Sequence, residues 1–418
     1  MQIGNRILAF FGCFTGEFYL IHVLFLCILA TGVEEPKLFT IDNLALYVLI
    51  VLAATTATSY LLHLFAKLTA YVVKKNPVFL KLFVKDLYVF ALIALAFLIY
   101  AVFSIYNESK AYSAEWGDDL VRYQEENIVY AEVDGLNMAA YVTGEGDHTV
   151  VLLGSSFDYF STLSLRPLAD RMAESNRVII LDYFGCGFSD DTTSERTAEN
   201  YVREIRAALT SLGEEGPYIL MPNEISGLYS LLYATEYPEE VEAIIALDTL
   251  VAGQHTDMMY AMGLTPSAYR TRLQREHFAL RPLNEFARFT GLNRTTWFLT
   301  EHHLKYNQSE VTLPLIAELY HMHVGNENAL NARMYYYDNH ERLIGVKYPS
   351  DLPVLSILGS QSVEGRYYPE SDWRALHDSL ISNPELQEVI EIPGNPYFAF
   401  SLPKEIAAKA QPFIDGLE

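Results

Sequence analysis

Hydrophobic residues are distributed unevenly along the chain, and the first quarter holds three long apolar stretches. They run over residues 7–33, 44–66 and 87–106. A helix needs about 20 apolar residues to cross a bilayer, so this pattern predicts three N-terminal transmembrane helices. A cleaved signal peptide would explain one such stretch but not three.

From about residue 127 the pattern changes to short apolar runs that alternate with amphipathic helices. The alternation predicts an α/β domain with a mainly parallel sheet and helices on both faces. Residues 250–348 interrupt it and are rich in Met, Tyr and His, so we expect a mostly helical cap over the strand ends. The predicted strands are a hairpin over 128–133 and 138–142, followed by 149–153, 177–182, 218–221, 241–248, 353–358 and 388–392.

The predicted organisation is a transmembrane region over 1–106, a linker over 107–126 and an α/β domain over 127–418. The loop between the second and third stretches is rich in lysine, and such loops stay in the cytoplasm. The large domain would then be extracytoplasmic in a multi-pass protein of the cell membrane. Glu17 and His22 interrupt the first stretch. They either make a polar contact with another membrane helix or a partner subunit, or Glu17 is neutral or precedes the true span.

Composition narrows the range of partners. The net charge is −23, and an acidic surface repels phosphate backbones, which argues against nucleic acid and against docking on anionic lipid. Of the three cysteines only Cys186 falls in the α/β domain, so we expect no disulfide within it. No histidine pair has the four-residue spacing of a helical zinc site, and we expect neither a metal nor a cofactor.

Three local motifs follow the predicted strands in a fixed order. Residues 182–189 read D-Y-F-G-C-G-F-S, residues 220–227 read L-M-P-N-E-I-S-G, and residues 392–397 read I-P-G-N-P-Y before a final helix that contains K-E-I. They resemble the D-x-x-G-x-G-x-S turn, the nucleophile elbow and the histidine loop of the α/β-hydrolase superfamily. The resemblance extends from about residue 127 to the end and looks closest to bacterial members with a P-H-S-x-S-G elbow.

A second resemblance concerns the N-terminal region. Residues 16–22, G-E-F-Y-L-I-H, and 59–63, S-Y-L-L-H, resemble the last two helices of membrane O-acyltransferases. Those enzymes need many more spans than this chain has, so we interpret the match as a relic or a coincidence.

The hydrolase resemblance implies a catalytic triad whose positions are substituted here. The nucleophile position is Glu224, where the family has a serine on a strained turn. The position of the general base is Pro396. The acid that orients the base would be Asp248, or alternatively Ser362 after the next strand. The cleft around them would be lined by Gly154, Ser155, Ser156, Asn223, Ile225 and Tyr397.

These substitutions change the expected chemistry. A serine hydroxyl is a weak nucleophile unless a base takes its proton. Glu224 is ionised and could attack directly, as an aspartate does in dehalogenases and epoxide hydrolases of this fold. The resulting ester would still need an activated water, which Pro396 cannot provide. The extra methylene of Glu224 also displaces its carboxylate, and a displacement of about 1 Å can cost 10²-fold in rate.

Other side chains offer two alternatives for a nucleophile and a base. Ser226 and Ser230 lie on the helix after the elbow, not at its apex, while Ser155 and Ser156 lie at a strand end. Histidines of the cap could reach the cleft, but we interpret them as ordinary packing or surface residues; they are His255, His302, His303, His321 and His323.

The sequence therefore favours an inactive pseudo-hydrolase that binds a small ester-like or lipid-like ligand, or a partner protein. One alternative is an active hydrolase of esters or related acyl substrates, with a serine or carboxylate nucleophile. A second alternative is an accessory subunit of a membrane complex, held in the lipid bilayer by its N-terminal helices.

Overall fold

The computed structural model describes residue 64 and residues 77–156, 160–253, 265–291, 293–294, 312–366 and 372–417. The chain divides into two compact units. The first unit comprises Met1–Ala111 with Phe289–Leu299, and the second comprises Tyr112–Arg288 with Thr300–Glu418. The sheet and all candidate site residues belong to the second unit.

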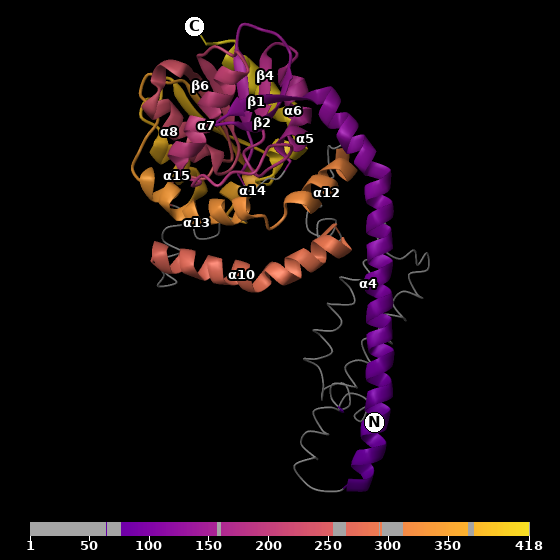
Figure 1. Ribbon diagram of the computed structural model, residues 1–418. Coiled ribbons are helices and arrows are strands. Elements are labelled where there is room, and N and C mark those ends of the chain that lie inside the picture. Colours follow the sequence, from indigo (N-terminus) through magenta and orange to yellow (C-terminus); the bar gives the residue numbers. More distant parts are fainter. Residues whose placement is uncertain are drawn as a thin grey trace, which may run out of the picture. The chain divides into compact units, whose positions relative to one another are not determined.

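A single eight-stranded sheet forms the centre of the second unit (Figure 1). The strand order is β1-β2-β4-β3-β5-β6-β7-β8; β1, β2 and β4 pair antiparallel, and every other neighbouring pair is parallel. The strands are β1 Ile128–Val133, β2 Leu136–Thr143, β3 Thr149–Leu153, β4 Arg177–Leu181, β5 Tyr218–Pro222, β6 Val241–Leu247, β7 Val354–Gly359 and β8 Gln387–Ile392. Each coincides with a predicted apolar run to within two residues, so the predicted α/β sheet is confirmed.

Helices cover both faces of this sheet. The helices are α4 Pro77–Asn127, α5 Ser161–Ser164, α6 Arg166–Met172, α7 Ala198–Ser211, α8 Ser226–Glu236, α10 Pro266–Thr290, α12 Thr312–His323, α13 Glu327–Arg342, α14 Ser360–Val363, α15 Trp373–Leu380, α16 Phe398–Ser401 and α17 Pro403–Ile414, with the 3₁₀ turn η1 Pro238–Glu240. One group contains α7 and α8, which pack against each other and on β1, β5 and β6. A second group contains α5, α6 and α17, which pack on β2, β4 and β7.

Helix α7 illustrates how the sequence determines an element. Thr197 precedes the helix and its side chain accepts a hydrogen bond from the backbone N–H of Asn200, which satisfies one of the free donors of the first turn. Val202, Ile205 and Leu209 recur at helical spacing and are buried in the core.

The predicted membrane region is not supported. Within the described residues, no helix combines the length and the apolar character that a membrane crossing needs. This finding contradicts the predicted transmembrane helices and the predicted multi-pass location with an extracytoplasmic domain. The stretches 7–33 and 44–66, with Glu17 and His22, lie outside the described residues apart from residue 64.

The third apolar stretch, residues 87–106, does not form a separate element. It is the first part of α4, which continues through the charged residues 107–126 and ends at Asn127. An average over an apolar window does not show where the helix that contains it ends, and here the helix extends 21 residues beyond Tyr106. Its last part, after Ala111, belongs to the second unit.

Candidate functional site

The strand-to-helix turn between β5 and α8 has the geometry of an exposed apex. Glu224 has φ = +48°, in the left-handed region that non-glycine residues rarely occupy. The backbone on both sides is fixed by hydrogen bonds, from Asn223 N–H to Leu153 O at 2.9 Å and from Leu250 N–H to Glu224 O at 2.9 Å. Strain of this kind is maintained only where the surroundings enforce it. The half-buried side chain of Glu224 is therefore held at the position predicted for the nucleophile.

Asn223 and Ile225 flank the apex and are buried. The Asn223 side-chain amide donates to Leu247 O at 3.0 Å, which ties the turn to the end of β6. Both residues thus anchor the turn, and neither presents its side chain to solvent.

Ser226 is not available as a nucleophile because its hydroxyl is committed to the fold. Its Oγ donates to Gly154 O and lies 2.8 Å from Tyr183 Oη. The side chain is fully buried, as is that of Ser230 on the next turn of α8. Gly227 is required here because a Cβ atom would overlap Thr249.

The loop after β3, which carries the predicted cleft residues Gly154, Ser155 and Ser156, lies beside the elbow, because Gly154 O accepts a hydrogen bond from Ser226. Ser155 and Ser156 are buried, and Ser156 Oγ lies 3.3 Å from Tyr229 Oη of α8. Gly154 contacts Ser161 so closely that any side chain at this position would overlap it. The loop is therefore packed against α5 and α8.

The two candidate acid positions, Asp248 and Ser362, are hydrogen-bonded to each other. Asp248 is buried at the end of β6 and receives three hydrogen bonds, from Ser362 Oγ at 2.5 Å, Trp373 Nε1 at 2.8 Å and Gly359 N at 3.2 Å. Burial raises the pKa of Asp248 to about 6, although the three donors oppose this shift. Its carboxylate is thus held by the α14–α15 region.

The position predicted for the base is Pro396, whose side chain holds no proton acceptor. Pro396 is buried in the loop after β8. The loop is attached to the end of β7, since Gln361 N donates to Gly394 O at 2.9 Å and Asn395 O lies against Gly359. Gly359 in turn donates to the acid. The loop that carries Pro396 is therefore attached to the same strand end whose backbone donates to Asp248, and a proline ring has no proton acceptor.

Tyr397 follows Pro396 and is half-buried at the start of α16. Its backbone N–H bonds to Asn395 Oδ1 at 3.0 Å. The residue thus helps to shape the loop.

Among the described histidines of residues 250–348, His323 contacts the turn after β4. His323 Nε2 lies 2.7 Å from Gly187 O, and burial lowers the pKa of His323. His321 is on the same helix, α12. The residues His255, His302 and His303 lie outside the described ranges.

Sequence reasoning missed two buried residues that surround the acid. Trp373 supplies the indole donor to Asp248, and His377 packs on it with ring centroids 4.9 Å apart. The imidazole nitrogens of His377 lie 2.9 Å from Trp373 O and 2.9 Å from Thr249 O. A buried tryptophan N–H needs an acceptor, and this rule is the one signal that could have drawn attention to Trp373.

The D-x-x-G-x-G-x-S turn is structural. Asp182 is fully buried and accepts from Thr162 N at 3.0 Å, Thr162 Oγ1 at 2.7 Å and Phe188 N at 3.2 Å. Gly187 has φ = +55°, and a Cβ there would overlap the Asp182 carboxylate. Burial raises the pKa of Asp182 to about 6. In the described part of the chain, no group of three or more His, Cys, Asp or Glu side chains is placed to hold a metal ion.

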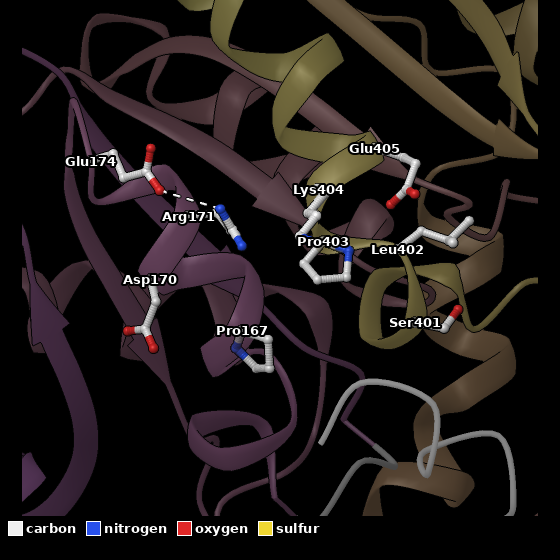
Figure 2. Close-up of a pocket in the computed structure, with 9 residues that line it drawn as sticks. All are labelled: Pro167, Asp170, Arg171, Glu174, Ser401, Leu402, Pro403, Lys404 and Glu405. Carbon is white, nitrogen blue, oxygen red and sulfur yellow. Dashed lines mark ion pairs between the residues drawn. The ribbon is translucent and has the colours of Figure 1, made fainter. Parts of the chain in front are cut away.

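A surface pocket of about 780 Å³ lies apart from these residues, between α6 and the start of α17 (Figure 2). It is lined by Pro167, Asp170, Arg171, Glu174, Ser401, Leu402, Pro403, Lys404 and Glu405. None of these is a candidate site residue, so this pocket is distinct from the elbow.

Comparison with solved structures identifies the fold. An epoxide hydrolase from Vigna radiata superposes with a TM-score of 0.51 at 20% identity, covering 70% of this chain and 98% of that one. The protein aCif-D158S superposes with a TM-score of 0.52 at 13% identity, covering 71% and 95%. The chain has the α/β-hydrolase fold. At these identities the likeness extends to the fold alone.

The curated relatives of this α/β-hydrolase-fold protein align with it over only part of their own length. The uncharacterized protein YbdG of Bacillus subtilis is 33% identical over 117 residues, 28% of this chain and 36% of that protein. A cis-3-alkyl-4-alkyloxetan-2-one decarboxylase of Shewanella oneidensis is 29% identical, covering 25% and 33%. A proline iminopeptidase of Saccharolobus solfataricus is 25% identical, covering 43% and 58%. No family model matches the chain. The chain is thus a hydrolase-like protein by fold.

Proposed function

We propose that this protein is a pseudo-hydrolase, which binds a ligand at the elbow but does not turn it over. The observation that carries the proposal is the state of the acid–base pair. Asp248 is engaged by three donors of the fold, and the neighbouring base position is Pro396. Turnover of an acyl substrate requires a proton acceptor beside the attacking group, and a proline ring has none.

The hydrogen bonds of Asp248 strengthen this argument. Oδ2 accepts from Ser362, and Oδ1 accepts from both Trp373 and Gly359. In a working triad one carboxylate oxygen orients an imidazole. Here both oxygens are bound to donors that hold α14 and α15 in place, so the carboxylate serves the structure of the domain.

The elbow still offers a binding feature. The carboxylate of Glu224 stands at the strained apex, next to the β3 loop that carries Ser155 and Ser156. A carboxylate accepts hydrogen bonds from hydroxyl or amine groups. We therefore expect a small ester-like or lipid-like ligand that carries such a donor.

The test is an assay of the purified full-length protein on a panel of short-chain acyl esters, together with labelling by a serine-directed fluorophosphonate. We expect no turnover and no labelling. Glu239→Ala, an exposed glutamate beyond the other end of α8, is the matched control for Glu224→Ala. Multiple turnovers by the wild type that Glu224→Ala abolishes and Glu239→Ala preserves would overturn the proposal.

A gain-of-function variant tests whether the absence of a serine nucleophile and a histidine base explains the expected inactivity. Glu224→Ser with Pro396→His supplies both missing groups, and we expect fluorophosphonate labelling only in this double variant. Each single substitution serves as a control, and circular dichroism checks that all variants fold. Labelling of Glu224→Ser alone would show that another base operates.

A second candidate function is covalent capture of an epoxide by Glu224. The apex φ of +48°, at a carboxylate that is itself a nucleophile, favours it. A Glu224 oxygen would attack an epoxide carbon, forming a C–O ester bond while the ring C–O bond breaks and the alkoxide takes a proton from water. The ester would persist, since Pro396 cannot activate the water that hydrolyses it.

Intact mass spectrometry distinguishes the two candidates. After incubation with a small epoxide, capture predicts a gain of one epoxide mass that Glu224→Gln abolishes and Glu239→Gln retains. An unchanged mass would exclude capture. Repeated release of diol would exclude both candidates.

A further inference from the structure

The imidazole of His377 lies between two carbonyl oxygens. The ring is fully buried on α15. Its Nδ1 lies 2.9 Å from Trp373 O, and its Nε2 lies 2.9 Å from Thr249 O. A carbonyl oxygen can only accept a hydrogen bond, and a neutral imidazole has a single N–H. A neutral ring would set a nitrogen lone pair against an oxygen lone pair, whereas a doubly protonated ring donates to both carbonyls.

The buried acid at the end of β6 has the opposite surroundings. Both oxygens of Asp248 accept hydrogen bonds, and the three contacts come from Ser362, Trp373 and Gly359. Burial raises the pKa of Asp248 to about 6, so this carboxylate is ionised at pH 7. A buried charge is costly unless an opposite charge lies nearby. A cation close to Asp248 would offset this cost.

Trp373 connects the two buried groups. Its indole N–H donates to Asp248 at 2.8 Å, and its ring packs on the ring of His377 with centroids 4.9 Å apart. The backbone makes a second connection, because Thr249, whose carbonyl faces Nε2, follows Asp248 in the chain. The acid and the imidazole are therefore neighbours through one side chain and one peptide unit.

We propose that His377 is a buried imidazolium that compensates the charge of Asp248 across the indole of Trp373. The acid then keeps an imidazole partner, supplied by α15, although the position predicted for the base is Pro396. This pair does not depend on whether the elbow binds a ligand.

Several charges act on the proton of His377. Burial, the largest influence, lowers the pKa of His377, and the two carbonyl oxygens raise it. On α15, Asp378 raises this pKa and Arg374 lowers it. These two side chains are partly exposed and pair with each other at 3.0 Å, and Arg374 also pairs with Glu391 of β8, so their effects on the ring largely cancel. Asp248 supplies the remaining buried charge, and its attraction favours the protonated ring.

The protonated ring also fixes the segment behind the elbow. Asp248 has φ = +46°, in the strained left-handed region. The next carbonyl, that of Thr249, faces His377, and Leu250 N–H then donates to Glu224 O at 2.9 Å. His377 is therefore a positioning residue for the apex that carries Glu224.

The test is nuclear magnetic resonance of the full-length protein with ¹⁵N-labelled histidine. At pH 7 we expect two directly bonded N–H signals from the ring of His377, and His377→Gln identifies them by their loss. A single N–H signal, from a neutral ring that donates to one carbonyl, would overturn the proposal. This measurement on the wild type stands even where a variant fails to fold.

A charge variant tests the partnership with Asp248. Asp248→Asn keeps the shape of the side chain and should lower the pKa of His377 by about one unit or more, because an adjacent opposite charge has an effect of this size. The matched control is Asp378→Asn, which removes a carboxylate next to His377 in the chain. It should shift this pKa by less than about half a unit, since solvent screens an exposed charge. Equal shifts in the two variants would contradict the pairing.

Urea unfolding at pH 7 gives a readout that the loss of packing alone does not produce. His377→Gln leaves the carboxylate of Asp248 buried without its counter-charge, whereas adding Asp248→Asn removes that charge as well. We expect the double variant to unfold at a higher urea concentration than His377→Gln alone. A lower midpoint for the double variant would show that the two groups do not compensate each other and would overturn the proposal.

Discussion

Replacing Trp373 with phenylalanine tests whether the buried acid is held by the fold. The substitution removes the indole donor that lies 2.8 Å from Asp248 Oδ1 and keeps an aromatic ring in the core. A hydrogen bond to a charged group contributes about 1.5–3 kcal/mol. One pKa unit corresponds to about 1.4 kcal/mol, so the pKa of Asp248 should rise by a further one to two units.

The sign of the pH dependence follows from the direction of this shift. Burial raises the pKa of Asp248 from 3.8 to about 6. The neutral acid is therefore the form that folding favours. Its contribution to stability is complete below the ordinary pKa and is lost as the pH rises through 6. Loss of the indole donor therefore lowers the unfolding free energy only at pH values at which the carboxylate of Asp248 is ionised.

The assay is urea unfolding of the full-length protein at pH 5 and at pH 8. The free energy of unfolding should fall by about 1.5–3 kcal/mol more at pH 8 than at pH 5 relative to the wild type. The smaller ring leaves a cavity, and that loss is the same at both pH values. Trp116→Phe, in α4 beside Tyr112, is the control and should show no such difference. A loss from Trp373→Phe that is equal at the two pH values would refute the reasoning.

Three further predictions concern stability. Glu204→Gln should lower the unfolding free energy by about 3–5 kcal/mol because it leaves Arg196 buried without its bidentate partner; adding Arg196→Met should recover much of the loss in a double-mutant cycle. Thr162→Val should lower the unfolding free energy by about 1–3 kcal/mol at pH 8 and by less below pH 6. Thr162 donates to the carboxylate of Asp182, and burial raises the pKa of Asp182 to about 6. Gly135→Ala should cost about 1–2 kcal/mol in thermal unfolding, since φ is +78° with open space around it, while Gly117→Ala in α4 should gain about 0.5–1 kcal/mol. If Gly135→Ala were more stable than Gly117→Ala, the left-handed backbone conformation of Gly135 would be contradicted.

The centre of the sheet could be predicted from the sequence because strands β3 to β7 are buried on both faces and read as continuous apolar runs. The run at residues 149–153 became β3 without change, and 241–248 became β6 with one residue fewer. The same signal misled at residues 87–106, which the structure describes. Apolar character at residues 87–106 does not show that the helix continues to Asn127, because charged residues are equally compatible with a helix.

The sequence located the loops of the candidate site but not their contacts. The order of motifs predicted Glu224 in the turn between β5 and α8 and Pro396 in the loop after β8, and the structure has both residues in these loops. The bond between Asp248 and Ser362 depends on how β6 and β7 pair and on the path of α14, which no local pattern reveals. Trp373 reaches the acid from a helix more than a hundred residues later in the chain. Contacts of this kind follow from tertiary packing.

The last strand of the sheet has a consequence for self-association. Strand β8 forms one border of the sheet, so half of its peptide groups face outward and could receive a strand from a neighbouring molecule. Its exposed Glu388 is a charged side chain on this border, and Glu391 pairs with Arg374 at 3.1 Å. Charged side chains on a border strand oppose the pairing of two copies, and so the growth of a continuous ribbon across molecules.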